Sequence, residues 1–231
     1  MNLRTLMAAS VVCAGVLATG CGGDSSEASD AAPGTPRDQL LLTGSELPAD
    51  AKPVNLPAER LREQLTDFAG VQSDSTIEPE ECRAPQLELE AASKRALDEA
   101  AVTAVVAETV IFIEFVSGGS IDLREFAETE ARCDELTVSS EFEGERVDSR
   151  VRVESRTPPA ALADVDAIAS YSTSTASVRD VTPTTTVSYA GWASLRGTTV
   201  AVRVTSLGDT LDEAKAEKFF ADAVRKVADA P

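Results

Sequence analysis

The stretch VTAVVAETVIFIEFV, from Val102 to Val116, is the most apolar part of the chain beyond its first twenty residues. β-branched and aromatic side chains dominate it, and Gly118-Gly119 follows it. Such side chains pack well on a pleated surface, and a nearly continuous apolar run is typical of a strand covered on both faces. We therefore expect a strand buried in the middle of a sheet, although the part before Thr109 also fits a helix.

Helical patterns lie on both sides of this stretch. We expect helices over residues 57–70 and 87–99, and a third over 121–134 that Asp122 caps. A last helix should follow the segment Thr210-Leu211-Asp212-Glu213, which has the spacing of a capping box. The apolar residues of these segments recur at helical spacing, which indicates one buried face on each helix.

Further along the chain the apolar residues alternate with polar ones, which is typical of strands with one solvated face. We expect hairpins over residues 136–154 and 187–204, and a further strand over 167–171. The Ser- and Thr-rich segment 172–186 contains Pro183, so we expect a long loop or a ragged edge strand there. The whole pattern predicts an α+β fold, with helices packed against a largely antiparallel sheet of about five or six strands.

The start of the chain resembles a bacterial lipoprotein signal. Arg4 is followed by an apolar run from Leu6 to Ala18 and then by Gly20-Cys21. The run is shorter than the roughly 20 residues that a spanning helix needs, so we interpret it as the core of a signal peptide. The interpretation predicts a lipid on Cys21, with palmitate among its acyl chains. The alternative is an ordinary secretory signal, with Cys21 a bystander.

This interpretation divides the chain into three parts. Residues 1–20 form the signal peptide, and residues 21–36 form the lipidated N-terminus and a flexible tether without large apolar side chains. Residues 37–231 form a single α+β domain. The expected location is the extracytoplasmic face of the cell membrane, because two acyl chains suffice for stable anchoring.

Composition excludes several classes of function. The chain has no histidine, which excludes serine–histidine and cysteine–histidine catalysis and histidine-based zinc sites. Its formal net charge of −18 disfavours nucleic acid as a partner. The acids at Glu78, Glu80 and Glu81 cluster, but they lie on a polar segment where solvated carboxylates are the usual case. We therefore expect no metal site, no cofactor and no catalytic residue.

Two cysteines remain after Cys13 leaves with the signal and Cys21 is committed to lipid. An even pair in an oxidising compartment predicts a disulfide between Cys82 and Cys133. The competing interpretation is a redox or nucleophilic pair, which would require Cys-x-x-Cys spacing or a nearby base.

Aromatic side chains are scarce, so their positions on the last strands are informative. Trp192, Tyr189 and Tyr171 are the candidate ligand-binding residues, since the strands that carry them could form the wall of a cleft. The alternative is that they fill the core, with a hydrogen bond at the polar tip.

Several short segments resemble the actinobacterial sensor-domain lipoproteins, which are related to the extracellular domain of the PknH-type receptor kinases. They are LLLTGSELP at 40–48, TIEPEEC at 76–82, RCDELTV at 132–138 and the closing helix from Leu211. The resemblance implies an α+β domain with a cleft for an unidentified ligand. The kinase sensor domains have two disulfides, whereas this chain can form one.

Three functional hypotheses follow. The first is a non-enzymatic ligand-binding or sensing lipoprotein, whose ligand is a small molecule or an envelope component in a partly apolar cleft. The second is a structural or interaction scaffold with an envelope protein partner, which would expose an apolar patch. The third is a carboxylate-dependent hydrolase of envelope glycans, which needs two acids facing one another across a groove.

Overall fold

The computed structural model describes residues 31–57, 59–61, 75–142, 144–178 and 181–231. Within these residues one antiparallel sheet has nine strands in the order β1-β3-β4-β9-β8-β7-β6-β5-β2. The strands are β1 (Lys52–Pro53), β2 (Thr76–Glu78), β3 (Ala101–Ala107), β4 (Val110–Gly118), β5 (Glu135–Phe142), β6 (Glu145–Arg156), β7 (Asp166–Val178), β8 (Thr184–Leu195) and β9 (Thr198–Ser206). The α+β class is confirmed, but the sheet is larger than the expected five or six strands.

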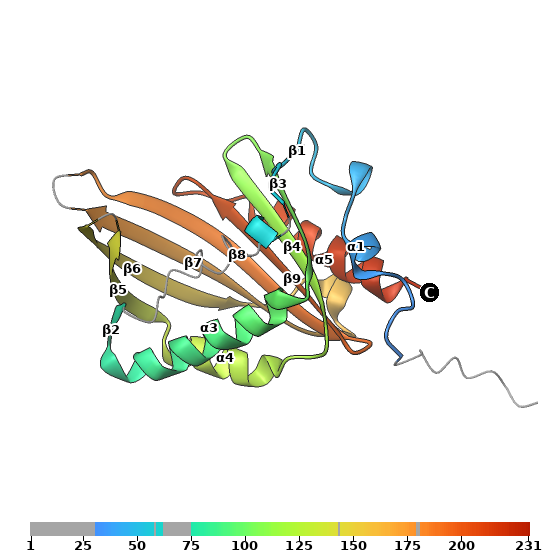
Figure 1. Ribbon diagram of the computed structural model, residues 1–231, viewed down its shortest axis with the longest axis horizontal. Helices are drawn as coiled ribbons and strands as arrows, with labels where there is room; N and C mark the ends of the chain where they lie inside the picture. The colour runs from blue at the N-terminus through green and yellow to red at the C-terminus, as the bar shows by residue number, and fades with distance from the viewer. Residues whose placement is uncertain (1–30, 58, 62–74, 143, 179–180) are drawn as a thin grey trace, which may run out of the picture.

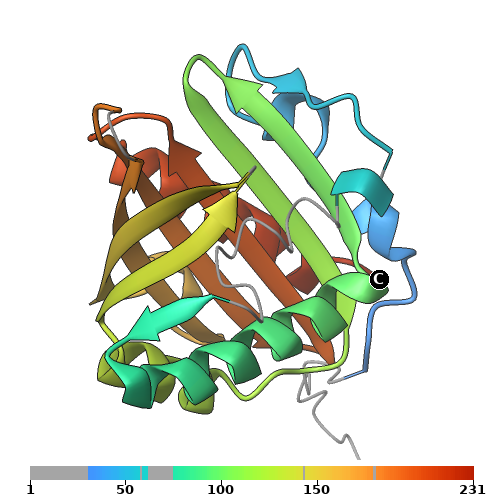
Figure 2. The same ribbon diagram turned by 60° about the vertical axis from the view of Figure 1, so that its left-hand side comes forward.

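Helices cover both faces of this curved sheet (Figure 1). Their bounds are α1 (Arg37–Leu40), α3 (Arg83–Asp98), α4 (Leu123–Arg132) and α5 (Glu213–Ala228). Three short 3-10 turns within the described residues span Gly44–Glu46, Glu80–Cys82 and Ala160–Leu162. α5 and α1 pack on one face, whereas α3 and α4 lie side by side against the other. Figure 2 shows α3 running along the open side of the curled sheet, from the β2 edge towards β3.

The stretch 102–116 forms two strands rather than the one expected. β3 and β4 pair as a hairpin from Ala101↔Val116 to Ala107↔Val110, and the turn between them places Glu108 at φ 55°. Positive φ in a tight hairpin turn usually requires Gly or Asn, so Glu108-Thr109 carries no recognisable turn signal. The prediction of a mid-sheet strand is confirmed for β4, which lies between β3 and β9.

The Ser- and Thr-rich segment belongs largely to two strands inside the sheet, and not to the expected long loop or ragged edge strand. β7 continues to Val178 and β8 begins at Thr184, with the register Ser172↔Ser188 and Ser174↔Thr186 between them. Pro183 lies in the connection, where its missing N–H breaks no ladder. The segment therefore lengthens two central strands. Ser and Thr are tolerated there because apolar side chains do not fill the sheet face completely.

The face under α5 holds the main hydrophobic core. Phe219 and Phe220 of α5 are buried there, and the Phe219 ring meets Phe112 of β4 edge-on with a centroid distance of 5.3 Å. Gly191 of β8 lies beneath the ring of Phe220. The N-cap of α5 is Asp212, whose Oδ1 accepts a hydrogen bond from the N–H of Lys215. The predicted box begins two residues earlier, so the expectation about this cap was wrong by two residues.

The disulfide between Cys82 and Cys133 is confirmed, with an S–S distance of 2.12 Å. It joins the turn before α3 to the residue after α4, and both cysteines pack with Ile77, Leu136 and Val138 in a small core. A crosslink across 51 residues restricts the unfolded chain, which corresponds to a stabilisation of about 4 kcal/mol in the loop-entropy model. The bridge holds α3 and α4 together at one end.

Two other expectations fall wholly or mostly outside the described residues. The signal peptide and Cys21 lie before residue 31, and most of the helix expected over 57–70 coincides with residues 62–74. Among the helices that are described, none is both long and apolar enough to cross a bilayer.

Candidate functional site

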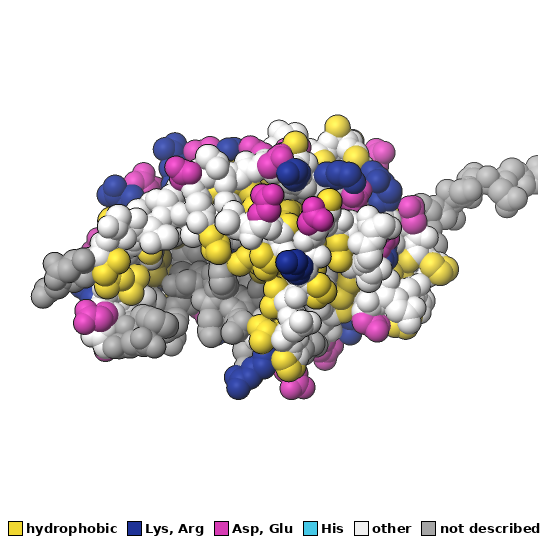
Figure 3. All heavy atoms as spheres, turned by 90° about the horizontal axis from the view of Figure 1, so that it is seen from above, with side chains coloured by type: hydrophobic (Ala, Val, Ile, Leu, Met, Phe, Trp, Pro, Cys, Tyr) yellow, Lys and Arg dark blue, Asp and Glu magenta, His cyan; other side chains and the backbone are white. Residues whose placement is uncertain are grey.

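A cavity of about 320 Å³ lies between the α3–α4 layer and the concave face of the sheet. It is lined by side chains from both helices and from strands β4 to β9, and so it depends on the curvature of the sheet. Seen from above, hydrophobic side chains gather in a band across the middle of the described surface (Figure 3). The volume of the cavity lies within the range of about 300–1,000 Å³ that is typical of small-molecule sites.

Aromatic rings form one end of the cavity. Trp192 of β8 is half-buried between Phe115 of β4 and Phe126 of α4, with ring-centroid distances of 5.2 and 5.1 Å. Both partners line the same cavity. The indole is therefore held from two sides, which gives a ligand a fixed aromatic surface.

A polar group lies at the α4 side of the cavity. Ser170 of β7 donates a hydrogen bond to Oε1 of Glu130, over 3.3 Å, and Arg203 of β9 attracts the same carboxylate. Burial raises the pKa of Glu130 to about 7, and the Ser170 hydroxyl and Arg203 only partly offset this effect. Glu130 can therefore change its protonation state near neutral pH, and a carboxyl poised in this way is characteristic of functional sites.

Hydroxyl groups form the wall opposite α3. Ser149, Ser172, Ser174 and Thr186 line the cavity from three neighbouring strands. Farther along the same face, the buried hydroxyls of Ser188 and Thr205 hydrogen-bond to each other over 2.9 Å. The cavity thus combines an aromatic end, a hydroxyl wall and a buried acid.

The structure separates the three aromatic residues predicted from the sequence. Trp192 lines the cavity, whereas Tyr189 is fully buried on the other face of β8, 6.4 Å from the Phe220 ring in centroid distance. Tyr171 is the cross-strand partner of Tyr189, and the guanidinium of Arg156 lies 5.1 Å from its ring centroid. Alternation along a strand explains the separation, because residues 189 and 192 point to opposite faces. Of the three, Trp192 alone remains a candidate.

Sequence reasoning did not find Glu130 or Arg203. Arg203 could have been noticed, because it is the single charged residue in the segment 198–206, whose other residues are apolar or small. This segment pairs with the strand that carries Trp192. Glu130 had no such signal, since it is one of several acids along α4. Only the packing of α4 on the sheet brings it beside Ser170.

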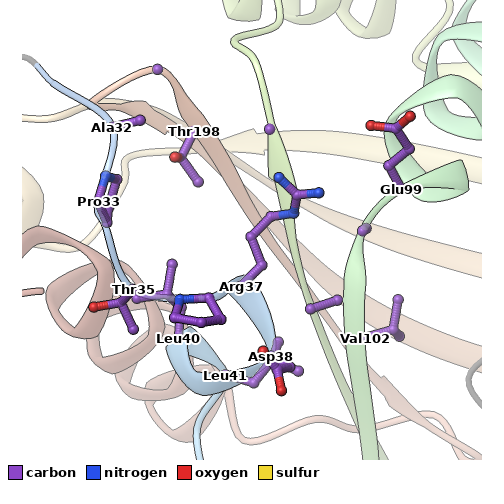
Figure 4. A pocket seen from close by; sticks show the side chains of 15 residues that line it. Ala32, Pro33, Thr35, Arg37, Asp38, Leu40, Leu41, Glu99, Val102 and Thr198 are labelled. Atoms are coloured by element: carbon purple, nitrogen blue, oxygen red, sulfur yellow. The ribbon is translucent and has the colours of Figure 1, made fainter.

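A second hollow, of about 580 Å³, is larger (Figure 4). It lies where residues 32–41 pass the ends of β3, β4 and β9, and Arg37 extends into it. Arg37 and Glu99 are both exposed there, and none of the described residues that line the hollow is aromatic. Exposed charges are screened by water and give little binding energy, so size alone does not make this hollow the better site.

Neither the acidic cluster nor any other group provides a metal site in the part of the chain that is described. Glu78 lies on β2, and Glu80 and Glu81 are exposed in the following turn. No set of three or more cysteine or carboxylate side chains among the described residues could hold a metal ion.

Comparison with known proteins identifies no family. No family model matches the chain, and none of the curated proteins matches it. Among solved structures, an uncharacterized protein of Mycobacterium smegmatis, the Rv0999 ortholog, is similar with a TM-score of 0.43. The two chains share 16% identity over 80% of this chain and 92% of that chain. A likeness at this level does not define a family, and membership of the sensor-domain family stays a prediction.

Proposed function

We propose that this protein is a cell-surface lipoprotein whose folded part is a non-enzymatic ligand-binding or sensing domain. A lipid on Cys21 would hold it on the outer face of the cytoplasmic membrane. The resemblance of its short motifs to the sensor-domain lipoproteins agrees with this proposal. Its ligand, a small molecule or an envelope component, would occupy the cavity between α3–α4 and the sheet.

The cavity carries the proposal. It joins a fixed aromatic end at Trp192 to a few convergent polar groups, which is the usual composition of a small-molecule site. Exposed large apolar side chains among the described residues are Leu56, Val181 and Leu207, and they come from three different loops. Single exposed apolar residues are ordinary on a protein surface, so the scaffold hypothesis has less support.

The experiment is to purify the protein from membranes and search for a bound small molecule by native mass spectrometry. The emission of Trp192, the only tryptophan, then follows titration with the released molecule. Phe126→Ala removes one side of the aromatic end and should weaken binding at least tenfold. Tyr171→Phe, outside the cavity, is the matched control and should leave affinity unchanged. Equal effects of the two substitutions would contradict the assignment of the site.

A carboxylate-dependent glycan hydrolase is the second candidate, because two acids line the same cavity. Glu130 has a pKa raised to about 7, as a general acid requires. Glu90 of α3 lies in the same lining but is paired with Lys94 at 2.7 Å. Incubation with nitrophenyl glycosides separates the candidates: a hydrolase releases nitrophenol and loses this activity in Glu130→Gln, whereas a binding protein releases none.

A further inference from the structure

The hydroxyl wall of the cavity is organised by strand register. Ser172 pairs with Val153 on one side and with Ser188 on the other, and Ser174 pairs in the same way with Val151 and Thr186. Directly paired residues point to the same face of a sheet. The strands therefore place hydroxyls in successive rows along the concave face.

The outer hydroxyls of this wall have spare hydrogen-bonding capacity. Thr175 and Thr185 bond to each other on the opposite face, and Ser188 bonds to Thr205. By contrast, the side chains of Ser172, Ser174 and Thr186 make no such bond with any described residue, and they are only half-buried because the cavity is open to them. Each hydroxyl offers one donor and two acceptor positions. An occupant without polar groups would cover these hydroxyls and leave them unsatisfied.

Among the described residues, three charged side chains line the cavity, and each of them has a partner. Glu90 pairs with Lys94, Glu130 accepts from Ser170, and Arg203 is attracted to Glu130. An ionic ligand would have to compete with these interactions. A neutral ligand with many hydroxyls can instead bond to the wall and leave them in place.

We infer that the cavity takes an uncharged saccharide of one or two rings. One ring would lie against Trp192 and Phe126, where its C–H surface replaces water on the indole, and its hydroxyls would exchange hydrogen bonds with Ser172, Ser174 and Thr186. The cavity volume of about 320 Å³ suits a ligand of this size. This inference rests on the proposed function and names the ligand class of the same site.

The test follows Trp192 emission during titration with maltose, cellobiose and trehalose. Glucuronate is the charged sugar probe, and palmitate is the amphiphilic long-chain probe. At least one neutral sugar should shift the emission and saturate. In the double variant Ser172→Ala/Ser174→Ala its affinity should fall about 25-fold, since each neutral hydrogen bond contributes about fivefold. Thr173→Val/Ser177→Ala changes the same strand on its other face and should leave the affinity unchanged. If the first double variant is unfolded, Thr186→Val replaces it.

The outcomes separate the ligand class from the function. Saturable binding of a neutral sugar that is lost in the wall variants alone supports the inference. Binding of palmitate or glucuronate without any neutral sugar overturns the inference, while the proposed binding function stands. If no probe changes the Trp192 emission and the purified protein carries no small molecule, both the saccharide inference and the proposed binding function are overturned.

Discussion

Glu114 of β4 has no exposed surface and lies on the face under α5. One carboxyl oxygen, Oε2, accepts a hydrogen bond of 2.9 Å from the N–H of Leu42, and the other has no hydrogen-bond partner among the described residues. Burial raises its pKa from 4.5 to about 7, against the opposing effects of the Leu42 bond and Lys226. The protonation state of Glu114, and with it the contact to the segment around Leu42, therefore changes with pH.

We expect the free energy of unfolding to fall as pH rises from about 5 to 8. Between the unfolded pKa and the native pKa of Glu114, the native state holds a proton that the unfolded state has lost. Its stabilisation is therefore fully present below pH 4.5 and is lost as pH passes 7. The shift corresponds to at most about 3 kcal/mol. Glu114→Gln should reduce the dependence of the free energy of unfolding on pH, measured by urea unfolding at pH 5, 6, 7 and 8. Part of the dependence that remains comes from Glu130, whose pKa is also raised.

Glu46→Gln is a neighbouring control for this slope, because the Glu46 carboxylate makes only the smallest contribution to the raised pKa of Glu114. Glu46 is exposed, and its pKa is lowered because Lys226 donates a hydrogen bond to its carboxylate at 2.6 Å. Its titration therefore lies below the pH range of the test. A wild-type slope in Glu114→Gln, or the same flattening in Glu46→Gln, would show that Glu114 is not the group that titrates.

At the scale of elements, β8 joins two environments through the alternation of its side chains. Val187, Tyr189 and Ala193 are buried under α5, whereas Ser188 and Trp192 face the cavity. Gly191 allows α5 to approach closely, because a Cβ there would lie 2.6 Å from the Phe220 ring. The packing of α5 on β8 thus depends on the absence of a side chain at one position.

Gly191→Ala should lower the free energy of unfolding by about 1–3 kcal/mol, because the added methyl overlaps a ring that the core holds in place. Urea denaturation measures this loss. Gly118→Ala is the control, since its nearest neighbour would be the end of the flexible Arg37 side chain at 3.0 Å. A loss in Gly118→Ala as large as in Gly191→Ala would show that glycine itself, and not the fit to Phe220, matters.

At the scale of the whole molecule, one sheet supports a dry core and a cavity on opposite faces. α5 and α1 close the first face with apolar side chains, whereas α3 and α4 cover the second and leave room beneath them (Figures 1 and 2). The disulfide fixes the helix pair at one end. The main hydrophobic core therefore lies on one face of the sheet, and the candidate binding site lies on the other.

The proposed membrane anchor is tested in the full chain. Cys21→Ser should abolish incorporation of a labelled palmitate analogue and shift the protein from the membrane fraction to the soluble fraction, because the thioether and amide-linked acyl chains need the cysteine. Cys13→Ser is the matched control, since that residue should leave with the signal peptide. Labelling that persists in Cys21→Ser would refute the anchor.

Local patterns in the sequence were sufficient for the helix that Asp122 caps, for the hairpin of β5 and β6 and for the pairing of Cys82 with Cys133. Alternation and helix capping depend on residues close together in the sequence, and the cysteine pairing follows by exclusion of the other cysteines. These features can therefore be predicted without knowledge of the tertiary structure. They failed at Glu108-Thr109 and in the segment 172–186, where the neighbouring strands decide the conformation. Glu108-Thr109 is an atypical turn pair, and in 172–186 strand-favouring Thr is mixed with Ser, Asp and Pro, so pairing with the neighbouring strands decides the conformation.

The sequence by itself determined the class of fold, the crosslink and the exclusion of histidine chemistry, because these depend on composition and local periodicity. Only the tertiary structure decided that Trp192 faces a cavity while Tyr189 enters the core, and that Glu130 meets Ser170 and Arg203. Those relations depend on strand register and on how a distant helix crosses a curved sheet. Both are set by the packing of the whole molecule, which no local pattern encodes.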